Sequence, residues 1–136
     1  MANLVCDIVT PAEQQFSEEC YMVAVPGSGG HMGFMPGHAP LMSTLADGEV
    51  RIFSDANTLT HRFACQGGYV QVTGEKVIIL ADRAMQVDDI DTSEVSSKIA
   101  ELKAAIDATP EDDVERNVLA YDLKWYETLQ HVAANK

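Results

Sequence analysis

The chain has 136 residues, a length that fits one β domain carrying a smaller appended unit. Its hydrophobic fraction of 46% is high enough to predict a packed core. Nine basic and 21 acidic residues give a formal charge of −12, which argues against binding to nucleic acid or to an anionic lipid surface.

The sequence predicts no segment that targets or anchors the chain. No apolar run, including the one at 77–80, approaches the ~20 residues of a membrane-spanning helix. The first residues lack the basic start and long apolar core of a secretory signal, so we expect no import sequence. Cys6, Cys20 and Cys65 match neither a disulfide framework nor a metal-binding motif, which predicts buried, reduced thiols.

The first two thirds of the chain have the alternation of short β-strands separated by turn residues. No helical periodicity is present before about residue 90. This spacing predicts an all-β sandwich or barrel. The expected strands are residues 3–9, 16–25, 32–35, 41–45, 50–54, 58–64, 69–72 and 76–80.

Residues 26–40, which we call the Gly/Pro rim, contain five glycines and three prolines, yet apolar residues interrupt them throughout. Proline fixes φ near its turn value and glycine adopts positive φ without steric cost. The segment therefore predicts a rigid, tightly turned edge of the β domain that presents His38 and its neighbours, with Pro36 and Gly37 opening a turn.

Two amphipathic helices are expected after residue 87. Asp91 with Glu94 three residues later resembles a capping box, and Thr109-Pro110 predicts a second helix start. Their apolar stripes are Val95, Ile99, Leu102 and Ile106 in the first helix, and Val114, Val118, Tyr121, Trp125, Leu129 and Val132 in the second.

The predicted fold class is therefore β + α: an N-terminal β-sandwich over residues 1–87, followed by a C-terminal antiparallel two-helix hairpin over residues 88–136. The two helices are joined by a short break at residues 108–109. Few apolar side chains are available to offset the entropy of ordering the hairpin. We therefore expect the hairpin to need the β domain or a partner to stay folded.

No motif predicts catalysis. The glycine-rich stretch 27–32 has Met32 in place of the last glycine of a dinucleotide fingerprint. No serine or cysteine lies in a motif that activates a nucleophile, and the histidines lack partner ligands at metal-binding spacing. We expect no catalytic residue, no metal and no cofactor.

The chain resembles the ε subunit of bacterial F-type ATP synthase along essentially its whole length. The PGHAPL block of residues 36–41 and the LAD that ends the strand at 80–82 form a specific combination. The remaining residues that carry the resemblance are Val25-Pro26-Gly27, Gly30, Gly33, Met35, Gly48, Val50-Arg51-Ile52, Gly67-Gly68, Val77-Ile78-Ile79, Asp89-Ile90-Asp91 and the two-helix tail.

The resemblance implies a non-catalytic central-stalk subunit that couples proton- or sodium-driven rotation of the c-subunit ring to the γ subunit and ATP synthesis. It implies γ and the c ring as partners, and transient contact of the hairpin with the α and β subunits. The complex would lie on the cytoplasmic face of the bacterial membrane, and this chain would reach the membrane only through it. The candidate γ and c-ring contacts are Gly33, Pro36, Gly37, His38, Ala39 and Pro40. For His38, a turn histidine satisfied by local backbone is an equal alternative.

The sequence departs from the family at a regulatory site. Some members bind ATP at the start of the hairpin through an (I/L)DxxRA motif. Ile90 and Asp91 match this motif, but Glu94 replaces its arginine and Val95 its alanine. Because an acid repels the phosphates that the arginine would meet, the sequence argues against ATP as a regulatory ligand.

Inhibition of ATP hydrolysis in the family draws on basic hairpin residues that meet an acidic segment of the β subunit. Residues 111–136 of this chain hold three basic and six acidic residues, so we expect charge-driven inhibition to be weak or absent. A different class of function stays open on the residues alone, namely a stand-alone ligand-binding β domain with the helices as a lid.

Overall fold

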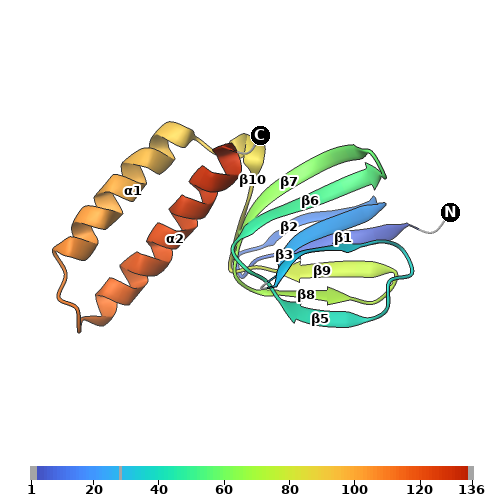
Figure 1. Ribbon diagram of the computed structural model, residues 1–136, viewed down its shortest axis with the longest axis horizontal. Coiled ribbons are helices and arrows are strands. Elements are labelled where there is room, and N and C mark those ends of the chain that lie inside the picture. Colours follow the sequence, from blue (N-terminus) through green and yellow to red (C-terminus); the bar gives the residue numbers. More distant parts are fainter. Residues whose placement is uncertain (1–2, 28, 135–136) are drawn as a thin grey trace. The chain divides into compact units, whose positions relative to one another are not determined.

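The computed structural model describes residues 3–27 and 29–134, which form β-strands followed by two helices (Figure 1). The chain divides into two compact units, Met1–Asp88 and Asp89–Lys136. This division lies one residue from the predicted junction between residues 87 and 88. The predicted β-sandwich followed by a two-helix hairpin is confirmed.

The first unit is built from two five-stranded sheets. The first sheet has the order β2-β1-β9-β8-β5, with β1 (Leu4–Val9), β2 (Gln14–Cys20), β5 (Leu41–Thr44), β8 (Tyr69–Val72) and β9 (Lys76–Leu80). The second has the order β10-β7-β6-β3-β4, with β3 (Met22–Gly27), β4 (Gly30–Phe34), β6 (Gly48–Asp55), β7 (Thr58–Gln66) and β10 (Arg83–Gln86).

The core lies between the two sheets because every second side chain of each strand points inward. In β1 the inward residues Leu4, Cys6 and Ile8 are fully buried, while the residues between them are half-buried. From the second sheet Val50 and Phe63, which are register partners on β6 and β7, enter the same hydrophobic cluster. The side chains therefore fill the interior of the sandwich.

The predicted single strand over residues 16–25 is wrong. The segment forms β2 in the first sheet and β3 in the second, and the chain changes sheets at Tyr21. There the backbone N–H of Tyr21 donates to the carbonyl of Phe53 on β6, 2.8 Å away. Because both halves favour extended backbone, the composition alone does not reveal the crossing. The sequence also missed β10, whose residues lack an apolar alternation.

The hairpin follows a single 3₁₀ turn at Val87–Asp89 and consists of α1 (Thr92–Asp107) and α2 (Val114–Ala134). Asp91 caps α1 as predicted: its carboxylate accepts hydrogen bonds from the backbone N–H groups of Ser93 and Glu94, at 3.0 and 3.2 Å. This interaction satisfies two of the N–H groups that have no partner inside the helix.

The predicted start of the second helix at Thr109 is wrong. The Thr109 hydroxyl instead donates back to the carbonyl of Ala105 in α1, at 2.7 Å. Asp113 replaces it as the cap, because its carboxylate accepts from the Glu115 N–H at 2.9 Å. The connection therefore spans residues 108–113. Within it, the carbonyl of Pro110 accepts a hydrogen bond from the Asp113 N–H at 3.1 Å, which closes a turn.

Gly68 links β7 to β8 at a point that admits no side chain. Its φ is +97°, and a Cβ there would lie 1.7 Å from the carbonyl oxygen of Leu80. We expect Gly68→Ala to lower the free energy of unfolding by at least about 2 kcal/mol, because both the backbone conformation and the contact become unfavourable. Thermal and urea unfolding of the full chain measure this loss.

The matched control is Gly29→Ala, since a Cβ at Gly29 meets no atom within 4 Å. We expect the free energy of unfolding of that variant to lie within about 0.5 kcal/mol of the wild-type value, as is usual for surface substitutions. Equal stability of the two variants would contradict the assignment of Gly68 as a steric constraint.

Candidate functional site

The structure places the candidate rim residues on the second strand of a hairpin and in the turn after it. Gly33 lies on β4 opposite Ala24, and Pro36 and Gly37 form the centre of a turn in which the His38 N–H donates to the Met35 carbonyl at 3.1 Å. Gly37 has a φ of +85°, as the third position of a type II turn requires. The predicted turn at Pro36-Gly37 is thus confirmed.

The rim is fixed to the first sheet by its own backbone. The N–H of Gly37 donates to the carbonyl of Gly74, 2.9 Å away in the β8–β9 connection. Among the candidate residues, Pro36 is half-buried, and the exposed ones are Gly33, Gly37, His38, Ala39 and Pro40. The turn is therefore anchored by this hydrogen bond and remains accessible at the edge of the β unit.

His38 is satisfied within this turn. Its Nδ1 lies 2.7 Å from the carbonyl oxygen of Ala39, so Nδ1 carries the proton and donates. Its ring meets the ring of Phe34 edge-on, with centroids 5.0 Å apart. These contacts fit the local-backbone alternative for His38 and leave the imidazole exposed for a partner.

The outer face of the first sheet carries an apolar belt that the sequence analysis did not single out. Register pairs align Val9 with Leu80, and Leu80 with Tyr69; Met42 lies in the neighbouring row, opposite Gln71. The exposed fractions are 46% for Leu80, 53% for Tyr69 and 66% for Met42. We call Val9, Met42, Tyr69, Ile78 and Leu80 the outer belt.

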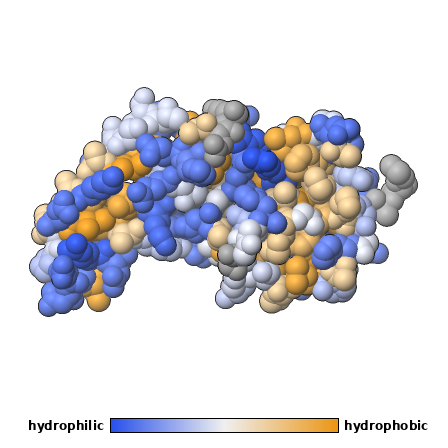
Figure 2. Space-filling view, viewed as in Figure 1, coloured by the Kyte–Doolittle hydropathy of each residue, from blue (hydrophilic) through white to orange (hydrophobic). Residues whose placement is uncertain are grey.

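Two shallow hollows flank this belt. One, of about 380 Å³, is lined by Val9, Thr10, Pro11, Gly68, Tyr69, Leu80, Ala81 and Asp82. The other, of about 440 Å³, lies beside the rim and is lined by Pro40, Leu41, Met42, Gln71, Val72 and Thr73. On the face seen in Figure 2, apolar residues gather over part of the β unit, and the hairpin combines hydrophilic residues with an apolar stripe. The rim and the outer belt thus form one extended surface.

A signal for the belt is present in the sequence. The segment Lys76–Leu80 is apolar at four consecutive positions, with Val77 and Ile79 in the core and Ile78 and Leu80 on the outside. A strand that is apolar on both faces is typical of a sheet covered on both sides.

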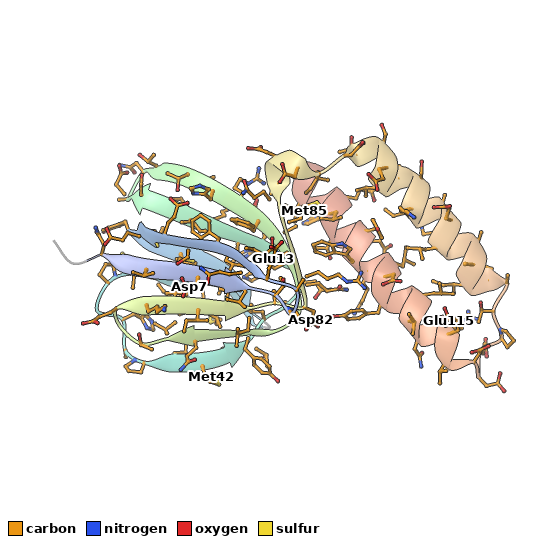
Figure 3. The ribbon with its side chains drawn as sticks, turned by 180° about the vertical axis from the view of Figure 1, so that it is seen from behind. Asp7, Glu13, Met42, Asp82, Met85 and Glu115 are labelled. Atoms are coloured by element: carbon orange, nitrogen blue, oxygen red, sulfur yellow. The ribbon has the colours of Figure 1, made fainter. Side chains whose placement is uncertain are left out.

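A charged group lies in the same sheet as the belt. Asp7 on β1 accepts a hydrogen bond from the Ser17 hydroxyl at 2.6 Å and pairs with the Lys76 ammonium at 2.9 Å. Figure 3 shows Asp7 on β1 and Met42 on β5; strands β9 and β8 lie between them in the first sheet. Burial opposes ionisation of Asp7, but the Ser17 hydroxyl and the Lys76 ammonium together hold its pKa below the ordinary value.

Two arginine side chains of the second sheet are paired with one carboxylate. Glu49 is buried on β6, and its two oxygens accept hydrogen bonds from Arg51, at 2.7 Å, and from Arg62. Arg51 and Arg62 are direct partners in the β6–β7 register, so Glu49 offsets the repulsion between them. This arrangement stabilises the sheet and leaves these guanidinium groups committed to Glu49.

Among the described residues, no group of three or more His, Cys, Asp or Glu side chains could hold a metal ion. No helix among them is long and apolar enough to cross a membrane.

The ATP-motif residues have structural roles. Ile90 is buried, and the Asp91 carboxylate is occupied by the two backbone N–H groups that it caps. Glu94, in place of the motif arginine, is exposed beside that cap. The Asp91 carboxylate therefore serves as the cap of α1.

The predicted hairpin stripe is buried in part. Val95, Ile99, Trp125 and Leu129 are buried, and Leu102 and Ile106 are half-buried. Val118 and Tyr121 are exposed by 53% and 39%. In an antiparallel pair the buried residues come together at the end where α1 starts and α2 finishes, and the exposed ones lie nearer the connection.

Comparison with known proteins decides the family. A protein-family model described as "ATP synthase, Delta/Epsilon chain, beta-sandwich domain" matches residues 3–87. The chain belongs to the ATP synthase delta/epsilon family. Among similar proteins, the ATP synthase epsilon chain of Hyphomonas neptunium is 32% identical over 94% of this chain and 94% of its own length. That of Maricaulis maris is 33% identical over 95% of both chains.

Solved structures share the fold of this family member. A chain of the Euglena gracilis mitochondrial ATP synthase, solved with OSCP, F1 and the c ring, superposes with a TM-score of 0.76 at 20% identity and covers 96% of this chain and 81% of its own. A chain of the Tetrahymena thermophila central stalk and c ring gives 0.54 at 12% identity, with coverages of 97% and 94%. As a member of the delta/epsilon family, this chain is a non-catalytic central-stalk subunit.

The Asp7 contacts predict a pH-dependent contribution to the stability of the ATP synthase subunit. Because the folded-state pKa of Asp7 is lowered, its contribution is present above its ordinary pKa of 3.8 and is lost as the pH falls through the lowered value. We expect Asp7→Asn to lower the free energy of unfolding by about 1 kcal/mol at pH 7. The difference from the wild type should shrink below pH 3.8. Urea unfolding across this pH range measures it.

The control is Lys76→Met, which removes the ammonium that pairs with Asp7. The effects of the two substitutions should be less than additive in the double variant, because both break one interaction. A difference between the wild type and Asp7→Asn that stays constant down to low pH would contradict the assignment.

Proposed function

We propose that this chain is the rotor subunit at the foot of the central stalk, where it joins the γ subunit to the c-subunit ring. Rotation of the ring, driven by protons or sodium ions, would pass through the β-sandwich to γ and so to ATP synthesis. The complex would lie on the cytoplasmic face of the membrane. The proposal rests on the family match over residues 3–87 together with the exposed outer belt.

The belt supports a protein partner because it leaves large side chains in water on a well-ordered surface. Tyr69 and Leu80 are direct partners on β8 and β9, so their side chains lie side by side. Exposed apolar groups on a rigid sheet, flanked by polar residues, are typical of protein interfaces. We assign the outer belt to γ and the adjoining rim, with Pro36, Gly37 and His38, to the contact with γ and the c ring.

The alternative of a stand-alone ligand-binding domain has less support. Its ligand would need a pocket inside the sandwich, but Phe34, Phe63, Leu4 and Ile8 fill that space and are almost fully buried. The two hollows lie on the outside of the first sheet. Open hollows on an apolar sheet suit side chains of a partner protein better than a small molecule.

Regulation by the hairpin is proposed to be weak in this subunit. Residues 111–136 carry three basic and six acidic groups. A net negative segment is repelled by an acidic segment of the β subunit, so contact between the hairpin and that subunit would gain little from charge. The residues at the start of α1 likewise do not fit ATP as a regulatory ligand.

The γ contact is tested by Leu80→Glu in the full chain. Leu80 lies in the outer belt, and placing a carboxylate there should weaken binding to γ of the same organism by at least about tenfold, since burial of one leucine contributes roughly 1.5–3 kcal/mol. Co-purification and titration calorimetry with the isolated γ subunit measure the loss.

Leu59→Glu is the matched control. Leu59 is exposed by 42%, close to the 46% of Leu80, but it lies on β7 in the second sheet. The Leu59→Glu chain should bind γ as tightly as the wild type does. Equal weakening in both variants would remove the outer belt from the interface, and no binding by the wild type would overturn the proposed function.

Weak regulation is tested by truncating the chain after Asp91 in the assembled enzyme. We expect ATP hydrolysis to rise less than about fivefold, because the acidic hairpin has no charge attraction to lose. Steady-state hydrolysis under matched assembly measures it. The full chain carrying Glu111→Lys and Glu127→Lys should instead become more inhibitory. A many-fold rise on truncation would contradict the proposal.

A further inference from the structure

The interior of the β-sandwich holds three thiols that the stalk function does not use. Cys6 on β1, Cys20 at the end of β2 and Cys65 on β7 are all buried and unpaired by any disulfide. All three belong to the hydrophobic cluster between the sheets. Buried cysteines of this kind usually act as small apolar side chains.

Two of these thiols are neighbours on adjacent strands. In the antiparallel β1–β2 register, Leu4 lies opposite Cys20 and Cys6 lies opposite Glu18. Cys6 and Cys20 are therefore diagonal neighbours, and both point into the core. The two side chains shift each other's pKa. Cys65 comes from the opposite sheet, where it lies on β7.

Their mutual proximity makes the two thiols chemically different. The neighbouring Cys20 side chain and burial raise the pKa of Cys6. The neighbouring Cys6 side chain lowers the pKa of Cys20, although burial acts in the opposite direction. Burial alone raises the pKa of Cys65 to about 12. Since the thiolate is the nucleophile, Cys20 is the most reactive of the three.

Cys20 also lies at the end of an edge strand. β2 is an edge strand of the first sheet, and Cys20 is its last residue before the chain crosses to the second sheet. Strand ends at a sheet edge open locally at a lower free energy than central strands. Such opening gives a small reagent access to Cys20, while Cys6 stays on the interior strand β1 beside it.

We propose that Cys6 and Cys20 form a redox-responsive thiol pair, which a hydroperoxide converts into a disulfide that joins β1 to β2. The Cys20 thiolate attacks one peroxide oxygen, the O–O bond breaks, and the other oxygen leaves as an alcohol or water after taking a proton. The Cys6 sulfur then attacks the sulfenic acid at Cys20. The S–O bond breaks, and hydroxide leaves as water with the Cys6 proton. Two thiols are oxidised by two electrons, and one peroxide is reduced.

The position of the pair predicts a readily reversible bond. Diagonal neighbours lie roughly 7–8 Å apart between Cα atoms, whereas a disulfide needs about 4.4–6.8 Å. The end of β2 must therefore shift when the bond forms. A disulfide that stores such strain is reduced easily by a thiol such as glutathione.

The test treats the full, native chain with hydrogen peroxide, alkylates the remaining thiols and measures the intact mass, followed by peptide mapping without reduction. We expect the loss of two of the three alkylatable thiols, one Cys6–Cys20 linkage, and recovery of all thiols with reduced glutathione. Cys65→Ala is the matched control and should lose both remaining thiols. Retention of all three thiols, or a linkage that includes Cys65, would overturn the proposal.

Single variants test the order of the two steps. Cys6→Ala should stop at a sulfenic acid on Cys20 that dimedone traps, and Cys20→Ala should leave Cys6 and Cys65 unmodified. Trapping on Cys6 in the Cys20→Ala chain would overturn the assignment of Cys20 as the attacking thiol. The linkage map of the wild-type chain decides the pairing even where a variant fails to fold.

Discussion

The β unit depends on burial of one face of each strand between two sheets. Leu4 and Ile8 of the first sheet and Val50 and Phe63 of the second fill this interior, and none is exposed by more than 1%. Because side chains alternate along a strand, filling the inner face fixes which residues appear on the outer face. The outer belt and the thiol pair are both placed by that alternation.

The outer face of the first sheet carries apolar residues that are not needed to fill the core. β9 is apolar on both faces, so Ile78 and Leu80 reach the outside while Val77 and Ile79 lie within. A second apolar layer on a rigid sheet fits the role of a subunit whose partner covers it. The firm attachment of the rim through Gly37 and Gly74 extends the same rigid surface.

The thiol pair and the hairpin illustrate how local interactions change the chemistry of otherwise ordinary residues. Cys20 differs from Cys65 because the neighbouring Cys6 thiol lowers its pKa, whereas burial alone acts on Cys65. Asp91 matches an ATP-binding motif by sequence, yet its carboxylate is used to cap α1. In each case the partner of the group, rather than its residue type, sets what it can do.

The sequence by itself determined the fold class, the junction near residue 88, the turn at Pro36-Gly37 and the Asp91 cap, because these follow from local periodicity and turn chemistry. The family resemblance also lay in contiguous motifs, so it needed no structure. Only the tertiary structure decided that residues 16–25 divide between two sheets, that α2 starts at Val114, and that Val118 and Tyr121 are exposed. Strand pairing and the choice between competing caps are made by contacts between residues distant in sequence. The placement of Cys6 beside Cys20 and of Leu80 beside Tyr69 is set by register, which composition and spacing do not encode.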